Sequence, residues 1–205
     1  ARELFKSQSR FADAVPLFAK EIAVVDDPAR KLALYRDEAD TRRSAGDMAG
    51  ASGALRQALA LQPDDGNLAY ELAYSIVERV DAGSEVPPEE RSEAAQVLIG
   101  MAESYDGEHG LSYAQAGLRV EPGNDRGMQL ADHYAEQLGR AGELVEAYQG
   151  YLQANPGGYM AERARGQLAA LGAPQSLGAP QSLPPQSLAA ASQQPGGYQQ
   201  APGSQ

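Results

Sequence analysis

The chain has 205 residues and a formal net charge of −11, and it contains neither cysteine nor tryptophan. The lack of cysteine excludes disulfides, thiolate metal ligands and a cysteine nucleophile, and the negative charge disfavours binding to nucleic acid or to anionic lipid. Alanine is abundant, aromatic residues make up 6%, and apolar and polar residues do not alternate over long runs. This composition predicts an all-α protein whose helices approach closely through small side chains, without a membrane span.

The amino-terminal region predicts one short and one complete helix. Residues 1–9 are too few for a full-length helix, whereas residues 9–22 have helical apolar spacing. The apolar face of this second helix comprises Ala14, Phe18 and Ile22. A truncated first helix would expose nearby apolar residues unless another element covers them. These residues are Leu4, Phe5 and Phe11.

Prolines mark an internal repeat. Pro122 and Pro156 are separated by a period of about 34 residues, which is typical of arrays of helix pairs. The unit that ends at Pro156 has the pattern of two helices joined by a turn at residues 139–142. The core positions of this unit are Met128, Ala131, Ala135, Leu144, Tyr148 and Tyr151. A second unit ends at Pro63. Its core positions are Tyr35, Ala39, Ala51, Leu55 and Ala58.

The stretch between Pro63 and Pro122 departs from this period. It is longer than one period and shorter than two, and its pattern predicts helices near residues 67–81, 90–105 and 109–121. The pattern leaves open whether the middle helix closes the preceding unit or opens the following one. In the unit that ends at Pro63, Glu38 and Arg42 stand where large apolar residues are usual, so we expect that unit to be distorted.

These positions resemble a tetratricopeptide (TPR) repeat protein over residues 1–171. The resemblance implies a right-handed α-solenoid of helix hairpins, each of which buries its apolar face against its neighbours. The last predicted helix would close the array, with its apolar residues on one face. They are Met160, Ala164, Leu168 and Leu171. This ending also looks like those of bacterial cell-envelope TPR proteins, which favours a periplasmic, cell-surface or secreted location over the cytoplasm.

The composition changes at Gly172. Residues 172–205 contain six prolines and no charged residue, which excludes a helix and predicts a non-helical, low-complexity tail. A disordered linker is the simpler interpretation. The alternative is an extended, polyproline-like segment that docks on a neighbouring copy through regularly spaced leucines. These leucines are Leu177, Leu183 and Leu188.

The sequence shows no catalytic or metal-binding pattern. His109 and His133 belong to different predicted elements, and there is no HExxH, P-loop, GxSxG or strand-linked GxGxxG motif. Acidic pairs at residues 26–27, 64–65 and 89–90 lie near predicted helix starts, where carboxylates complement the helix dipole. We therefore expect a protein that is not an enzyme and that uses no metal or cofactor.

The TPR resemblance implies a partner-binding surface, because the concave face of such proteins is lined chiefly by the first helix of each hairpin and holds a peptide. Carried over by position, this face comprises Arg36, Asp40, Arg43, Tyr70, Tyr74, Glu78, Gln129, His133 and Glu136. Tyr70 and Tyr74 are one helical turn apart and would either form a contact patch or pack against the next helix. An ordinary, partly exposed histidine is the simpler interpretation of His133.

These observations favour a non-enzymatic scaffold that binds protein or peptide segments. The alternative is a self-assembling subunit of a bacterial filament or surface assembly, joined by the tail and the incomplete first unit. A regulatory module cut from a larger enzyme is a third hypothesis.

Overall fold

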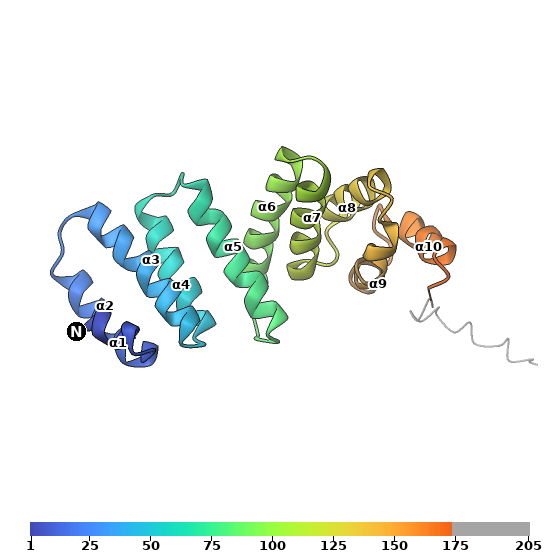
Figure 1. Ribbon diagram of the computed structural model, residues 1–205. Coiled ribbons are helices and arrows are strands. Elements are labelled where there is room, and N and C mark those ends of the chain that lie inside the picture. The colour runs from blue at the N-terminus through green and yellow to red at the C-terminus, as the bar shows by residue number, and fades with distance from the viewer. Residues whose placement is uncertain (174–205) are drawn as a thin grey trace, which may run out of the picture.

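The computed structural model describes residues 1–173, and in this range the chain is all-helical, as predicted, without a β-strand (Figure 1). None of its helices combines the length and the apolar character that crossing a bilayer requires. The α-helices are α1 (Arg2–Ser7), α2 (Phe11–Ala23), α3 (Pro28–Ser44), α4 (Met48–Leu61), α5 (Gly66–Asp81), α6 (Pro88–Ser104), α7 (Gly107–Val120), α8 (Asp125–Gln137), α9 (Val145–Ala154) and α10 (Ala161–Ala170). A 3₁₀ helix, η1 (Ala141–Leu144), leads into α9.

The helices form an extended row with α1 at one end and α10 at the other (Figure 1). Each helix packs against its neighbours in sequence, and α5 also contacts α7, α6 contacts α8, and α7 contacts α9. Ion pairs join α1 to α3, α3 to α5, α4 to α6 and α8 to α10. The row therefore has two layers. We call α1, α3, α5, α7 and α9 the odd layer, and α4, α6, α8 and α10 the even layer.

One continuous apolar core runs between these layers from α3 to α10. Its contact positions are rich in alanine, which lets helix backbones approach closely. The core positions expected from the repeat are buried, with Tyr35 only half-buried. The buried ones are Ala39, Ala51, Leu55, Ala58, Met128, Ala131, Ala135, Leu144, Tyr148 and Tyr151.

Side-chain caps determine where several helices begin. Asp27 accepts a hydrogen bond from the backbone N–H of Ala29 at 3.1 Å, and Asp65 accepts one from that of Asn67 at 2.9 Å. Such caps satisfy N–H groups that have no partner within the helix. The third acidic pair, at residues 89–90, lies in the first turn of α6. The acidic pairs therefore mark helix starts, as predicted.

The structure resolves the irregular stretch into α5, α6 and α7. The middle helix, α6, packs more extensively on α7 than on α5, so it pairs with the helix that follows it. The expected distortion at Glu38 and Arg42 is wrong, because α3 continues through both residues. The Arg42 guanidinium pairs with Glu38 at 2.7 Å and with Asp47 at 2.6 Å. These ion pairs satisfy the charges of Arg42 and Glu38 at positions where apolar residues are usual.

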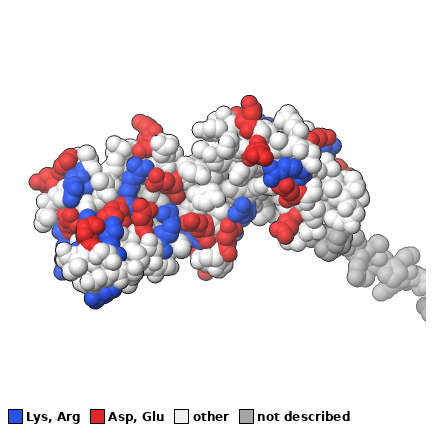
Figure 2. Space-filling view, in the orientation of Figure 1, with Lys and Arg blue, Asp and Glu red and all other residues white. Residues whose placement is uncertain are grey.

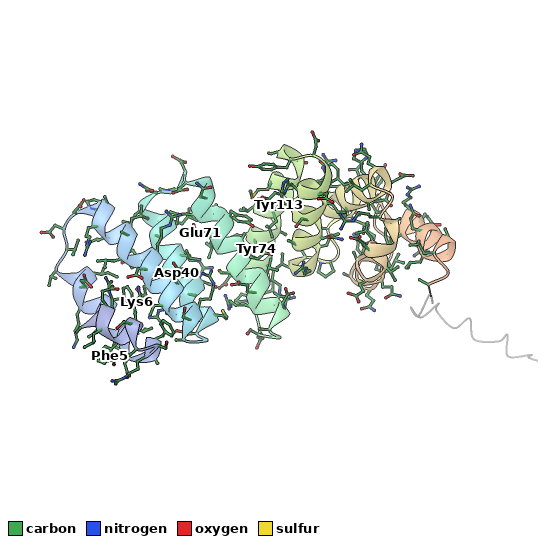
Figure 3. The ribbon with its side chains drawn as sticks, in the orientation of Figure 1. Phe5, Lys6, Asp40, Glu71, Tyr74 and Tyr113 are labelled. Carbon is green, nitrogen blue, oxygen red and sulfur yellow. The ribbon has the colours of Figure 1, made fainter. Side chains whose placement is uncertain are left out.

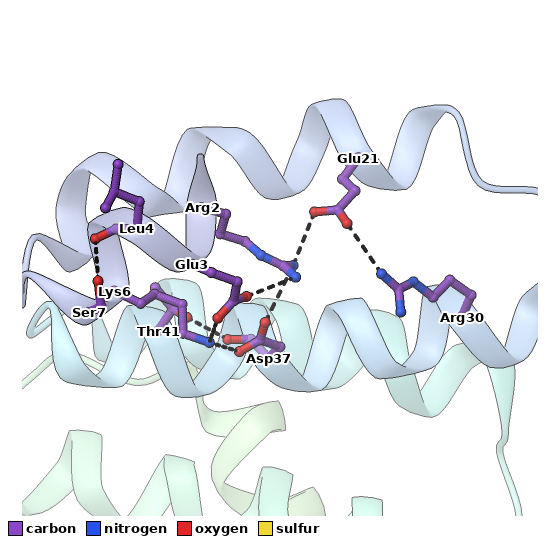
Figure 4. Close-up of polar contacts among 9 residues, drawn as sticks. All are labelled: Arg2, Glu3, Leu4, Lys6, Ser7, Glu21, Arg30, Asp37 and Thr41. Carbon is purple, nitrogen blue, oxygen red and sulfur yellow. Dashed lines mark hydrogen bonds and ion pairs between the residues drawn. The ribbon is translucent and has the colours of Figure 1, made fainter.

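The first helix is short, as predicted, and is held mainly by charge, since α1 has no buried residue. Lys6 pairs with Asp37 of α3, and Arg2 bridges Asp37 and Glu21 at 3.3 Å each (Figure 4). Of the apolar residues at this end, Leu4 is 59% exposed. Phe5 and Phe11 are half-buried.

We predict that replacing Asp37 with Asn detaches α1. So short a helix is not stable alone in water, and amide hydrogens in α1 should therefore exchange several-fold faster in this variant. In 1 M NaCl, where the Debye length falls to about 3 Å, the wild-type protein should show the same change. Hydrogen exchange followed by mass spectrometry measures both effects. Asp40→Asn, on the same helix, is the control, and equal protection of α1 in both variants would contradict this account.

Glycine at position 110 is required by the packing of α7 on α8. A Cβ atom there would lie 2.6 Å from the Tyr134 ring and would also meet the Tyr105 carbonyl oxygen. We predict that Gly110→Ala lowers the free energy of unfolding by about 1–3 kcal/mol. The control, Gly100→Ala in α6, meets no atom within 4 Å and should raise it by up to about 1 kcal/mol. Urea unfolding followed by circular dichroism tests the pair, and equal stabilities would contradict the prediction.

Candidate functional site

A groove on the even layer is the first candidate surface. It runs along α8, between the end of α6 and the start of α10, and has a volume of about 880 Å³. Burial of Met128, Ala131 and Ala135 on one face of α8 directs the opposite face outward. Gln129, His133 and Glu136 are exposed on that outer face, and all three line the groove. We call it the α8 groove.

The base of the α8 groove is a buried polar network around Asp132. The Tyr148 hydroxyl donates to Asp132 at 2.6 Å, and Arg163 and Gln167 of α10 donate to the same carboxylate at 3.0 and 3.2 Å. Burial is the main cause that raises the pKa of the Tyr148 phenol, and the hydrogen bond to Asp132 raises it further. The phenol therefore stays protonated at neutral pH and ties α9 to α8.

The rim of the α8 groove carries charges that are already paired. Arg126 contacts Glu103 of α6 at 2.7 Å and the Gln129 side chain at 2.7 Å. Arg163 contacts Glu136 at 3.0 Å. These pairs lie at the surface, so each contributes little to stability. Breaking any one of these pairs therefore costs little free energy.

A second candidate surface lies on the odd layer, where α3 and α5 face the viewer in Figure 3. Arg36 pairs with Glu71 at 2.6 Å, and two turns further along the same helices Arg43 pairs with Glu78 at 3.1 Å. Arg43 also contacts Asp40 at 3.0 Å. The charged residues expected here therefore form a ladder between neighbouring helices.

The charge ladder adjoins a line of aromatic rings. Ring centroids are 5.7 Å apart for Tyr74 and Tyr70, 5.8 Å for Tyr70 and Tyr113, 5.5 Å for Tyr113 and Tyr105, and 6.5 Å for Tyr105 and His109. We call these five residues the tyrosine stripe. Tyr74 is 41% exposed and Tyr105 is 47% exposed. Tyr70 thus packs on Tyr113 of α7, while Tyr74 faces solvent.

The tyrosine stripe differs from its surroundings in charge. Red and blue side chains interleave over the α1–α5 half of the molecule, and the area where Tyr74 and Tyr113 lie is white (Figures 2 and 3). Burial, followed by the neighbouring phenols of Tyr113 and Tyr74, raises the pKa of Tyr70. The stripe therefore consists of four phenol rings and one imidazole, and none of its five residues is Lys, Arg, Asp or Glu.

The structure does not bring the nine expected residues together on one face. Six of them lie on α3 and α5 of the odd layer, and three lie on α8 of the even layer. Sequence reasoning missed Tyr105 and Tyr113, because only the packing of α7 on α5 brings Tyr113 to Tyr70, and Tyr105 joins the line through Tyr113. It also missed Tyr159, which lines the α8 groove and is 80% exposed. Leu177, Leu183 and Leu188 lie outside the described residues.

No protein-family model matches this chain, and no curated protein matches its sequence. Within residues 1–173, no group of three or more His, Asp or Glu side chains is arranged to hold a metal ion. The surfaces must therefore be interpreted from their own chemistry.

We predict that Tyr148→Phe destabilises the protein by about 2 kcal/mol, because it removes a buried hydrogen bond to a carboxylate. Tyr159→Phe removes the same atom from an exposed side chain and should change stability by less than about 0.5 kcal/mol. Thermal unfolding at neutral pH measures both. Equal effects would mean that the hydrogen bond from Tyr148 to Asp132 does not contribute to stability.

Proposed function

We propose that this chain is a non-enzymatic scaffold with a TPR-like, right-handed helical solenoid, and that it binds extended peptide segments in the α8 groove. The observation that carries the proposal is the groove itself. It combines exposed polar side chains on its walls with a buried network that fixes its base.

The solenoid is supported by spacing and packing together. Pro88, Pro122 and Pro156 follow one another at the same period of about 34 residues. Pro88 is the first residue of α6, which begins the α6–α7 pair. Pro122 precedes the α8–α9 pair, and Pro156 precedes the final helix, α10. The core is continuous along the row, as expected when repeated units shelter one another's apolar faces. Peptide binding by the surfaces of such arrays is what the TPR resemblance implies.

The lining of the α8 groove favours a peptide with basic side chains. Its acidic residues are Glu103, Asp132, Glu136 and Glu162, and its basic residues are Arg126 and Arg163. Four carboxylates against two guanidinium groups leave a net negative lining, in a chain of charge −11. Complementary charge favours encounter and orientation of a cationic partner. Tyr159 adds an exposed ring that can cover an apolar side chain of the peptide.

Selection from a random dodecapeptide display library on the immobilised full chain tests this function. Selected peptides should be enriched in Lys and Arg, and fluorescence polarisation should give an affinity at least tenfold weaker, about 1.4 kcal/mol, for Glu136→Lys. The control is Glu146→Lys, also an exposed position but on α9 of the odd layer, which makes the same charge change and should leave affinity unaltered. If no peptide is selected, or if both variants weaken binding equally, the α8 groove is not the site.

A further inference from the structure

The tyrosine stripe offers a surface suited to an uncharged, proline-rich chain. Aromatic rings that line a shallow groove are a general means of holding polyproline II segments, because prolyl rings pack on aromatic faces. The carbonyl groups of such a segment have no partner within it, and phenol hydroxyls can donate to them. Tyr70 and Tyr113 make an edge-to-face contact at 87°, which orients these two rings relative to each other.

The chain itself contains such a segment directly after the described residues. Residues 174–188 carry the repeats PQSL, PQSL and PPQSL. In each of them a proline precedes a leucine by three positions. A polyproline II helix has three residues per turn and rises about 9 Å per turn, so each proline and its leucine share one edge. That step exceeds the 5.5–5.8 Å between adjacent tyrosine rings, and the two side chains would therefore contact alternate rings.

Length and charge agree with this pairing. Fifteen residues in polyproline II geometry reach about 46 Å. The helix α7 lies three helices from α10 in the row, which is about 30 Å at ordinary helix spacing. Within one chain, about ten residues span this distance, and the last repeat, PPQSL, is left to contact the stripe. The segment carries no charge, so it meets no repulsion from an acidic protein and loses no charge solvation on docking.

We propose that residues 174–188 of this chain dock on the tyrosine stripe. This interaction is separate from the peptide binding proposed for the α8 groove. Four stripe residues lie on α5 and α7 of the odd layer, Tyr105 lies in the link between α6 and α7, and none of the five lines the groove.

A nitroxide on the segment tests the docking in the full chain. The protein has no cysteine, so Ser182→Cys provides a unique attachment site. In ¹⁵N-labelled protein, the amide resonances of Tyr74 and Tyr113 should lose most of their intensity, while those of Gln129 and His133 in the α8 groove keep theirs. Combining Ser182→Cys with Tyr74→Ser and Tyr105→Ser, two exposed positions, should restore the intensity at Tyr113.

Two further comparisons make the result decisive. Pro174, Pro180 and Pro185 replaced together by Ser should also remove the effect, because the serine segment loses its polyproline bias. Mixing spin-labelled ¹⁴N protein with unlabelled ¹⁵N protein shows which copy provides the docked segment. Broadening in the mixture assigns the docking to a neighbouring copy, and the absence of broadening in the mixture assigns it to the same chain. Either result supports the contact. Unchanged intensities at Tyr74 and Tyr113, or broadening confined to the α8 groove, would overturn the proposal while leaving the peptide-selection result unaffected.

Discussion

Mutual burial between neighbouring helices is the constraint on which the rest of this molecule depends. The shortest α-helix, α1, has 6 residues, and α3 and α6 have 17 each. Helices in this range are at best marginal alone in water. Each one is stabilised by the helices beside it, and the result is a core that continues from α3 to α10. Alanine at the contact positions suits this role, because it loses no side-chain entropy on burial and lets backbones approach.

The same constraint leaves the polar residues on the outer surfaces of the two layers. There, arginines pair with carboxylates of the next helix in the same layer, as Arg36 does with Glu71 and Arg163 with Glu136. Exposed pairs of this kind contribute about 1 kcal/mol or less, so they specify which helices lie side by side more than they stabilise them. The exception is α1, which has no buried residue and depends on its charges.

A single helix, α5, decides how the surfaces are divided. It accounts for the length by which the stretch between Pro63 and Pro122 exceeds one repeat period. Because consecutive helices alternate between layers, one additional helix moves each later unit's first helix to the opposite layer. Thus α3 and α8, which the proline spacing predicts to hold corresponding positions, lie in different layers. The chain consequently has an uncharged aromatic surface on one side and an acidic groove on the other.

Much of this architecture was determined by the sequence alone. Apolar spacing and the prolines predict the helices, the acidic pairs predict where three of them begin, and small residues identify the core, because all these signals act within one helix or one turn. Which helices become neighbours in space does not follow from such local signals. The pairing of α6 with α7, the contact of Tyr113 with Tyr70 and the separation of His133 from Arg36 were decided only by the tertiary structure. The layer in which a residue lies depends on how many helices precede it. The contacts depend on side chains far apart in the sequence that meet across a packed interface, and local conformational preferences do not determine such meetings.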